Sequence, residues 1–124
     1  MFTSDFYEGW GAVLNEAMAN GCAIVASCAP GSVPFLVSHN ENGMIYKYGN
    51  YKNAYIAVKS LLDDPKKANK LGEKAQKTIF DYNYKVAATR LVNGVSEFYS
   101  DGKITPADSG VFSPVQVLKN NWFK

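Results

Sequence analysis

The sequence predicts an α/β fold in which helices flank a parallel sheet. Strand signals at residues 2–4, 23–26 and 44–46 alternate with helical patterns, and this alternation is typical of a doubly wound sheet. The run at 23–26 is short and continuously apolar, as in strands that are buried on both faces. With 47% hydrophobic and 19% charged residues, the chain has the composition of an ordinary folded domain.

Residues 12–20 form the first predicted helix. Ala, Leu, Glu and Met favour a helix, and Asn20 followed by Gly21 is a good C-terminal stop. The helix is apolar nearly all round, so we expect it to be buried. Glu16 within it is then expected either at the rim of a cleft or out of water with a partner, because an unpaired buried carboxylate costs several kcal/mol.

The loop before this helix, residues 4–11, sets Glu8 eight positions ahead of Glu16. Gly9 and Gly11 allow a ligand to approach the backbone closely, and the N–H groups of the first helical turn suit a phosphate. An ionised carboxylate only accepts hydrogen bonds, so a ligand rich in hydroxyl groups would satisfy Glu16. The loop and the helix together therefore indicate a ligand site.

Further helices are predicted along the rest of the chain. A short turn or helix is expected at residues 32–37, between the second and third strands. Apolar residues recur at helical spacing over residues 51–62. The next helix begins at Pro65, because proline is favoured at the first helical position, and its apolar residues continue through Ile79. A third long helix is predicted over residues 88–98.

Charge and hydropathy exclude some classes of partner. The net charge is +2, from 13 Lys and Arg against 11 Asp and Glu, which is too small to indicate nucleic acid or a membrane surface. No apolar run approaches the roughly 18 residues of a membrane span, and residues 1–5 lack the features of a signal peptide. We therefore expect a cytoplasmic protein.

The cysteines and the histidine indicate neither a disulfide nor a metal site. Cys22 and Cys28 flank the predicted strand 23–26, which at about 3.3 Å per residue separates them by roughly 20 Å, beyond disulfide reach. We interpret both as small buried residues. His39, the only histidine, lies in a turn-rich connection and is interpreted as an exposed turn residue, so no metal site is expected.

One stretch of the chain resembles a known family. The residues that carry the resemblance are Ser4, Glu8-Gly9-Trp10-Gly11, Glu16-Ala17-Met18-Ala19, Gly21, Val25-Ala26-Ser27, Gly31, Pro34 and Gly43. In this order they resemble the C-terminal domain of the retaining glycosyltransferases of glycosyltransferase family 4, which have the GT-B fold of two Rossmann-like domains. The pair Glu8 and Glu16 looks like that family's E-x7-E motif. The resemblance is tight over residues 4–46, looser to Phe98 and nearly absent beyond.

The resemblance implies a role for each matching residue. Glu8 would be the catalytic position, hydrogen-bonding hydroxyls of the donor sugar and holding it for attack. Glu16 would accept hydrogen bonds from the ribose of the nucleotide, and the loop backbone would lie near the sugar and the diphosphate. The donor-binding positions are then Gly9, Trp10, Gly11, Ala12 and Glu16. Family members generally retain anomeric configuration without a metal, so no cofactor is expected besides the donor, a UDP-, GDP- or similar nucleotide sugar.

Plainer interpretations stay open for several of these residues. Glu8 would have no function as a solvated loop carboxylate, and Glu16 would have none at the rim of its helix. Trp10 suits packing that shapes the loop better than stacking on a sugar. Four tyrosines are interpreted as a helix face and its strand, with no ligand assigned. They are Tyr46, Tyr48, Tyr51 and Tyr55. Phe35 stands where many family members carry an acidic residue.

The predicted domain organisation is that of a C-terminal fragment. Three strands are too few for a free-standing domain of this type, which usually has about five or six. We expect a partial nucleotide-sugar-binding domain over residues 1–99, a linker over 100–112 and an amphipathic helix over 113–124. In the family the last helix packs on the N-terminal domain, which is missing here. Its apolar residues would then be exposed or find a substitute partner, and the fragment could associate.

Two functions are weighed for the chain. The first is a glycosyltransferase that transfers a sugar with retention to a saccharide or lipid-linked acceptor, in surface or capsular polysaccharide biosynthesis, with peripheral membrane association of the whole protein as an option. This chain would be its donor-binding part and inactive alone, because no Lys or Arg precedes Glu8 to stabilise the departing diphosphate. The alternative is a non-catalytic α/β nucleotide-sugar-binding or assembly module. The two glutamates with Gly9 and Gly11 favour the first function, and the missing acceptor domain favours the second for this polypeptide by itself.

Overall fold

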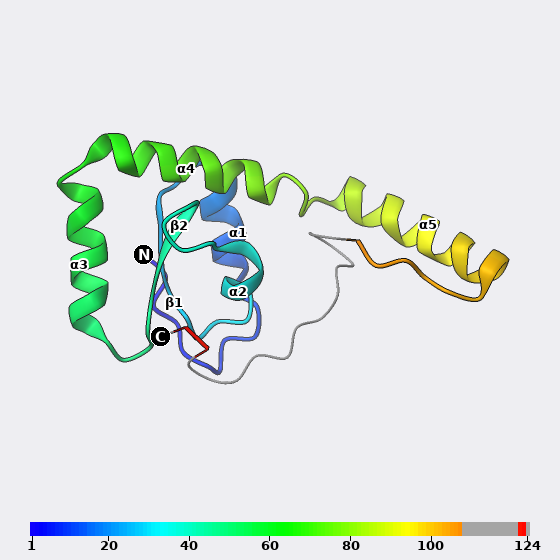
Figure 1. Cartoon of the computed structure of the whole chain (residues 1–124), viewed down its shortest axis with the longest axis horizontal. Coiled ribbons are helices and arrows are strands. Elements are labelled where there is room, and N and C mark those ends of the chain that lie inside the picture. The colour runs from blue at the N-terminus through cyan, green and yellow to red at the C-terminus, as the bar shows by residue number, and fades with distance from the viewer. Residues whose placement is uncertain (108–121, 124) are drawn as a thin grey trace. The chain divides into compact units, whose positions relative to one another are not determined.

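The computed structural model of the chain describes residues 1–107 and 122–123 (Figure 1). These residues divide into two compact units, which are treated separately below. The first contains residues 1–79 together with Trp122 and Phe123, and the second begins at Phe80. No helix in the described part of the chain is long and apolar enough to cross a membrane.

The first unit is built on parallel strands. Strand β1 (Ile24–Ser27) pairs in parallel with β2 (Gly43–Tyr46), and every residue of both strands is buried. Phe2 forms a parallel bridge to Ala26, so this segment lies along the other edge of β1. The predicted α/β class with a parallel sheet is thereby confirmed, because strands buried on both faces need helices to cover them.

Four helices surround these strands. They are α1 (Ala12–Ala19), α2 (Val33–Leu36), α3 (Tyr51–Leu62) and α4 (Pro65–Ile79). Helix α3 contacts both strands, and α4 contacts both strands and each of the other three helices. In Figure 1 the strands lie between α3 and the pair α1 and α2, with α4 running across them. The predicted positions of all four helices are confirmed to within a few residues.

One cluster of the core forms where α3 and α4 meet the strands. Its buried members are Val25, Met44, Tyr46, Ala54, Ala57, Leu61 and Leu71. On α3, Ala54 and Leu61 of the predicted apolar pattern are buried, and Ala57, which the pattern did not include, lies on the same face. Tyr55 and Leu62, which belong to the same sequence pattern, are instead 66% and 75% exposed. The buried face of α3 is therefore narrower than the pattern suggests.

Helix α4 lies very close to the end of α1. Gly21 ends α1 in the left-handed region with φ 69°, and a side chain at Gly72 would lie 2.0 Å from the Gly21 carbonyl oxygen. Gln76 adds a hydrogen bond from Nε2 to the Ala19 carbonyl at 2.9 Å. The absence of a side chain at Gly72 thus allows the backbones of the two elements to touch.

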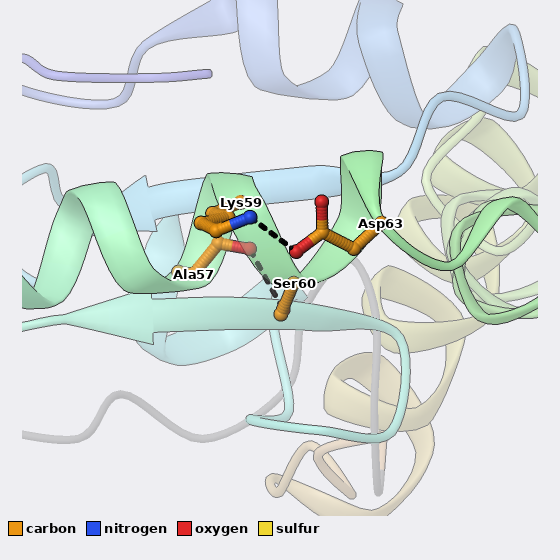
Figure 2. Close-up of polar contacts among 4 residues, drawn as sticks. All are labelled: Ala57, Lys59, Ser60 and Asp63. Atoms are coloured by element: carbon orange, nitrogen blue, oxygen red, sulfur yellow. Dashed lines mark hydrogen bonds and ion pairs between the residues drawn. The ribbon is translucent and has the colours of Figure 1, made fainter.

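The C-terminal half of α3 carries an exposed ion pair and a part-buried hydrogen bond. Lys59 Nζ pairs with Asp63 Oδ2 at 2.6 Å, and the Ser60 hydroxyl donates to the Ala57 carbonyl at 2.8 Å (Figure 2). The Lys59 and Asp63 side chains are 54% and 60% exposed. Ion pairs of this kind contribute little to stability, so the buried face holds α3 in place.

The second unit consists of α5 (Tyr84–Asp101) and the segment that follows it. Asn83 caps the helix by accepting the Val86 N–H at 3.0 Å, and Gly102 ends it at φ 69°. The Thr105 N–H then donates to the Glu97 carboxylate at 3.0 Å. The third long predicted helix is confirmed, with wider bounds than 88–98, and none of its residues is buried.

Two expectations about burial are wrong. Helix α1 is not buried on all sides: Leu14 and Met18 are buried, whereas Val13 is 63% exposed, because only one face of the helix packs on its neighbours. Cys22 is exposed, since it follows Gly21 in the turn before β1, whereas Cys28 is buried as expected. Both thiols are free.

The last residues of the chain are described only in part. Trp122 donates its indole N–H to the Cys28 carbonyl at 2.9 Å, and the Phe123 ring lies 5.0 Å from the His39 ring. His39 itself is exposed, as predicted. The rest of the expected helix over residues 113–124 lies outside the described residues, and the boundaries 1–99, 100–112 and 113–124 stay predictions.

Candidate functional site

The loop that precedes α1 begins with a turn made by Asp5. Its Oδ1 accepts the Tyr7 N–H at 2.9 Å, and its backbone carbonyl accepts the Glu8 N–H at 3.2 Å. A side-chain acceptor two residues before the donor is the arrangement of an Asx turn. The turn reverses the chain soon after Phe2 and brings Glu8 to the start of the glycine-rich segment.

Gly11 ends the loop and caps α1. It lies in the left-handed region at φ 80°, and its carbonyl accepts the Leu14 N–H at 2.9 Å. A β-carbon at this position would be 2.3 Å from the Phe2 ring. Glycine is therefore required here by both the backbone conformation and the space available.

Trp10 contacts residues of α1 and α2 and so holds the loop of residues 4–11 against these helices. Its indole N–H donates to Asn15 Oδ1 at 2.9 Å, and its ring centroid lies 5.9 Å from that of Phe35. Its backbone carbonyl accepts the Ser32 N–H at 3.2 Å. These are the contacts of a residue that shapes the loop, as the plainer interpretation of Trp10 proposes. Phe35, which departs from the family pattern, supplies one of the packing partners.

The connection between β1 and α2 supports the same loop from a second position. A β-carbon on Gly31 would lie 2.0 Å from the Gly9 carbonyl oxygen, so the two backbones are in direct contact. Together with the contacts of Trp10, this approach restricts the path of the chain between Glu8 and Gly11.

A pocket of about 490 Å³ opens beside the loop. The described residues that line it are Thr3, Ser4, Asp5, Tyr7, Glu8, Tyr46, Tyr48, Gly49 and Tyr51. It lies where the Phe2 segment and β2 reach their carboxyl ends, which is the edge at which parallel α/β sheets bind ligands. The described lining contains two carboxylates and several hydroxyl groups, and no Lys, Arg or His.

Tyrosines form the side of the pocket that the sequence does not predict. Tyr46 ends β2, and the turn that follows is closed by a bond from the Asn50 N–H to the Lys47 carbonyl at 2.9 Å, with Gly49 at φ 79°. This turn brings Tyr48 and Tyr51 to the same pocket as Tyr46. The feature of the sequence that could have predicted this side of the pocket is a group of three tyrosines around a Gly-Asn turn directly after a buried strand.

The environment of Tyr46 keeps its phenol protonated. Burial raises the pKa of Tyr46 above its usual value, and the nearby Tyr51 and Cys28 raise it further. The hydroxyl therefore remains a hydrogen-bond donor to a higher pH than that of an exposed tyrosine does.

The two predicted carboxylates are not in the same pocket. Glu8 is partly buried and lines the pocket, whereas Glu16 is exposed on α1 and is not among the described lining residues. Of the two alternatives for Glu16, removal from water with a partner is wrong because the side chain is exposed, and a place at the rim of a cleft stays a prediction. Among the donor-binding positions, Gly9, Trp10 and Ala12 are exposed and Gly11 is buried. No group of three or more potential metal-ligating side chains occurs in the described residues.

Fold and site together define an α/β domain of Rossmann-like type with a glycine-rich loop leading into a helix. The family of glycosyl transferases group 1 matches residues 1–78, which is more than half of the chain, and the chain belongs to this family. It is similar to the D-inositol 3-phosphate glycosyltransferase of Corynebacterium aurimucosum, with 31% identity over 88 residues. That similarity covers 71% of this chain and 21% of the relative.

Solved structures show the same fold. Sucrose-phosphate synthase from Thermosynechococcus elongatus matches with a TM-score of 0.65 and 25% identity, over 73% of this chain and 23% of that one. The Anabaena protein HepE in complex with UDP matches with a TM-score of 0.60 and 26% identity, over 77% of this chain and 26% of that one. The chain thus spans about a quarter or less of these proteins.

Proposed function

We propose that this chain is part of the donor-binding domain of a retaining glycosyltransferase. The whole protein transfers a sugar from a nucleotide-diphosphate sugar to a saccharide or lipid-linked acceptor. The observation that carries the proposal is the position of Glu8 in a polar pocket directly beside the loop that begins α1. Family membership supports it, and so do the similar HepE structures, which are complexes with UDP and with UDP-glucose.

In this proposal the two glutamates serve different parts of the donor. Glu8 accepts hydrogen bonds from hydroxyls of the sugar and holds it for attack. Glu16 is exposed and therefore available to the ribose hydroxyls of the nucleotide. The backbone of residues 9–12 lies near the diphosphate at the N-terminal end of α1, where the helix dipole favours negative charge. No metal takes part.

The wider role follows from the same proposal. The acceptor is bound by a domain outside this chain, the reaction belongs to surface polysaccharide biosynthesis, and the protein works in the cytoplasm or at the inner face of the membrane. The alternative is a non-catalytic nucleotide-sugar-binding or assembly module. It is favoured by the lining of the pocket, whose described residues include no cation to stabilise a departing diphosphate.

A binding experiment on the 124-residue chain tests donor recognition. Titration with UDP-glucose and with GDP-mannose, followed by calorimetry, is expected to show binding of one of them. Glu16→Ala is expected to weaken that binding roughly tenfold, the size of a lost charge-assisted hydrogen bond. Glu73→Ala is the control, because Glu73 is also an exposed helical glutamate but lies on α4. Absence of binding to every nucleotide sugar tried would contradict the proposal.

Kinetic measurements on the complete protein test whether Glu8 and Glu16 have different roles. Glu8→Ala is expected to lower turnover more than donor binding, whereas Glu16→Ala lowers donor binding more than turnover. Equal losses of binding in the two variants would show that the glutamates act on the same part of the donor.

A further inference from the structure

The pocket beside Glu8 is lined by two segments of different chemistry. Residues 3–8 contribute both carboxylates together with Tyr7, whereas residues 46–51 contribute three tyrosines and a glycine. Exposure increases along the second segment, from 3% at Tyr46 to 40% at Tyr48 and 75% at Tyr51. One tyrosine is therefore part of the core, and the other two are available to a ligand.

Tyr48 is held in place from two directions. Its backbone N–H donates to Cys28 Sγ at 3.4 Å, and its ring makes an edge contact with Phe6 at 5.3 Å between centroids. Tyr51 stands on the first turn of α3, whose position is set by the Asn50 cap on the Asn53 N–H at 3.0 Å. Both side chains are thus carried on ordered segments of the first unit.

The lining selects a class of ligand. Asp5 and Glu8 are acceptors only, so they repel phosphates and favour a ligand that donates several hydrogen bonds. The described lining holds no cation to balance an anionic ligand. Aromatic rings next to these acceptors suit a ring that has an apolar C–H face and hydroxyls at its edge. A volume of about 490 Å³ is within the range of small-molecule sites.

We propose that this pocket binds a neutral hexose, with Tyr48 stacking on the sugar ring and Tyr51 helping to select which hexose is bound. The proposal rests on the proposed function, because it names residues of this chain that determine its sugar specificity. Tyr48 and Tyr51 contact the sugar directly. The diphosphate lies outside this pocket, toward the backbone of residues 9–12.

The first experiment is saturation-transfer NMR on the full chain with D-glucose as the probe. Selective irradiation of aromatic protons is expected to transfer saturation to glucose. Tyr48→Leu is expected to weaken glucose binding about three- to tenfold, the range of one aromatic contact. Tyr48→Phe keeps the ring and is expected to bind as the wild type does. Tyr55→Leu is the matched control, because Tyr55 is an exposed tyrosine of α3 outside the described lining.

A second variant keeps the test independent of folding. Tyr51 is 75% exposed, so Tyr51→Ala leaves the core intact, and it is expected to change the ratio of the affinities for glucose and galactose. Circular dichroism and thermal unfolding confirm that each variant folds. Unchanged glucose affinity in Tyr48→Leu, or no saturation transfer to glucose in the wild type, would overturn the hexose pocket.

A parallel titration with UDP separates this inference from the proposed function. One outcome is that the wild type binds UDP while Tyr48→Leu has unchanged glucose affinity. This outcome overturns the hexose pocket but agrees with the proposed donor binding. Glucose binding that depends on Tyr48, without binding of any nucleotide, supports the pocket and overturns donor binding.

Discussion

Gly11 illustrates how a single residue determines the start of the site. Its φ of 80° and the Phe2 ring, 2.3 Å from where its β-carbon would be, act against any side chain. The sequence suggested that Gly11 allows a ligand to approach the backbone closely. In the structure, the group that excludes a side chain at Gly11 is the Phe2 ring of the protein itself.

Gly11→Ala is therefore expected to lower the free energy of unfolding by about 2–4 kcal/mol, from left-handed strain and overpacking together. Gly49→Ala is a matched control, because Gly49 has a similar φ of 79° with open space around it. The control is expected to lose about 1 kcal/mol. Urea unfolding measures both variants, and equal losses would contradict a steric role for Phe2.

Tyr46 gives a prediction about pH. Burial holds its folded-state pKa above the unfolded value of about 10, so folding favours the protonated phenol. This contribution is fully present below the unfolded pKa and is lost as pH rises through the folded pKa. Unfolding in urea from about pH 9 to about pH 11 is expected to show a steeper loss of stability in the wild type than in Tyr46→Phe. Parallel curves for the two proteins would exclude this linkage.

At the scale of elements, exposed and buried contacts of α3 differ in their energetic weight. The Lys59–Asp63 pair in Figure 2 is more than half exposed, whereas Leu61 is only 9% exposed and belongs to the core cluster. The short distance between Lys59 and Asp63 suggests a strong interaction, but screening by solvent makes its contribution to stability small.

Lys59→Ala is accordingly expected to change the free energy of unfolding by less than about 0.5 kcal/mol. Leu61→Ala is expected to cost about 2–5 kcal/mol, because it leaves a cavity between α3 and its neighbours. Chemical denaturation compares the two variants directly, and a larger effect at Lys59 would reverse the ranking.

Helix α1 shows where an element-level prediction fails. Its bounds follow from propensity and from the stop at Gly21, and both are local properties. Its burial does not follow, because Val13 and Leu14 are equally apolar and only the packing partners decide which of them faces the core. For the same reason the two cysteines differ in burial although they are the same residue type: Cys22 is exposed and Cys28 is buried.

At the scale of the whole molecule, the chain belongs to a glycosyltransferase family and spans 21% of the curated relative it resembles. The described residues of its pocket supply hydrogen-bond acceptors and no cation. On the proposed function, we therefore expect donor binding without turnover from this chain.

The isolated chain is expected to show no sugar transfer, because leaving-group stabilisation is a large part of such catalysis. The measurement is release of UDP from UDP-glucose in the presence of simple saccharide acceptors. Turnover above that of a Glu8→Gln control would contradict the expectation.

The sequence by itself determined the helices, two of the three predicted strands and the broad glycosyltransferase family, because propensity, periodicity and motif order are properties of neighbouring residues. Tertiary structure alone decided which side chains share the pocket. Tyr46 and Tyr48 line the same pocket as Glu8 because β2 and the Phe2 segment run parallel on either side of β1 and end at the same edge. Glu16 lies outside that pocket because the turns of α1 carry it to the exposed face, and spacing along a chain does not specify the face on which a helix packs.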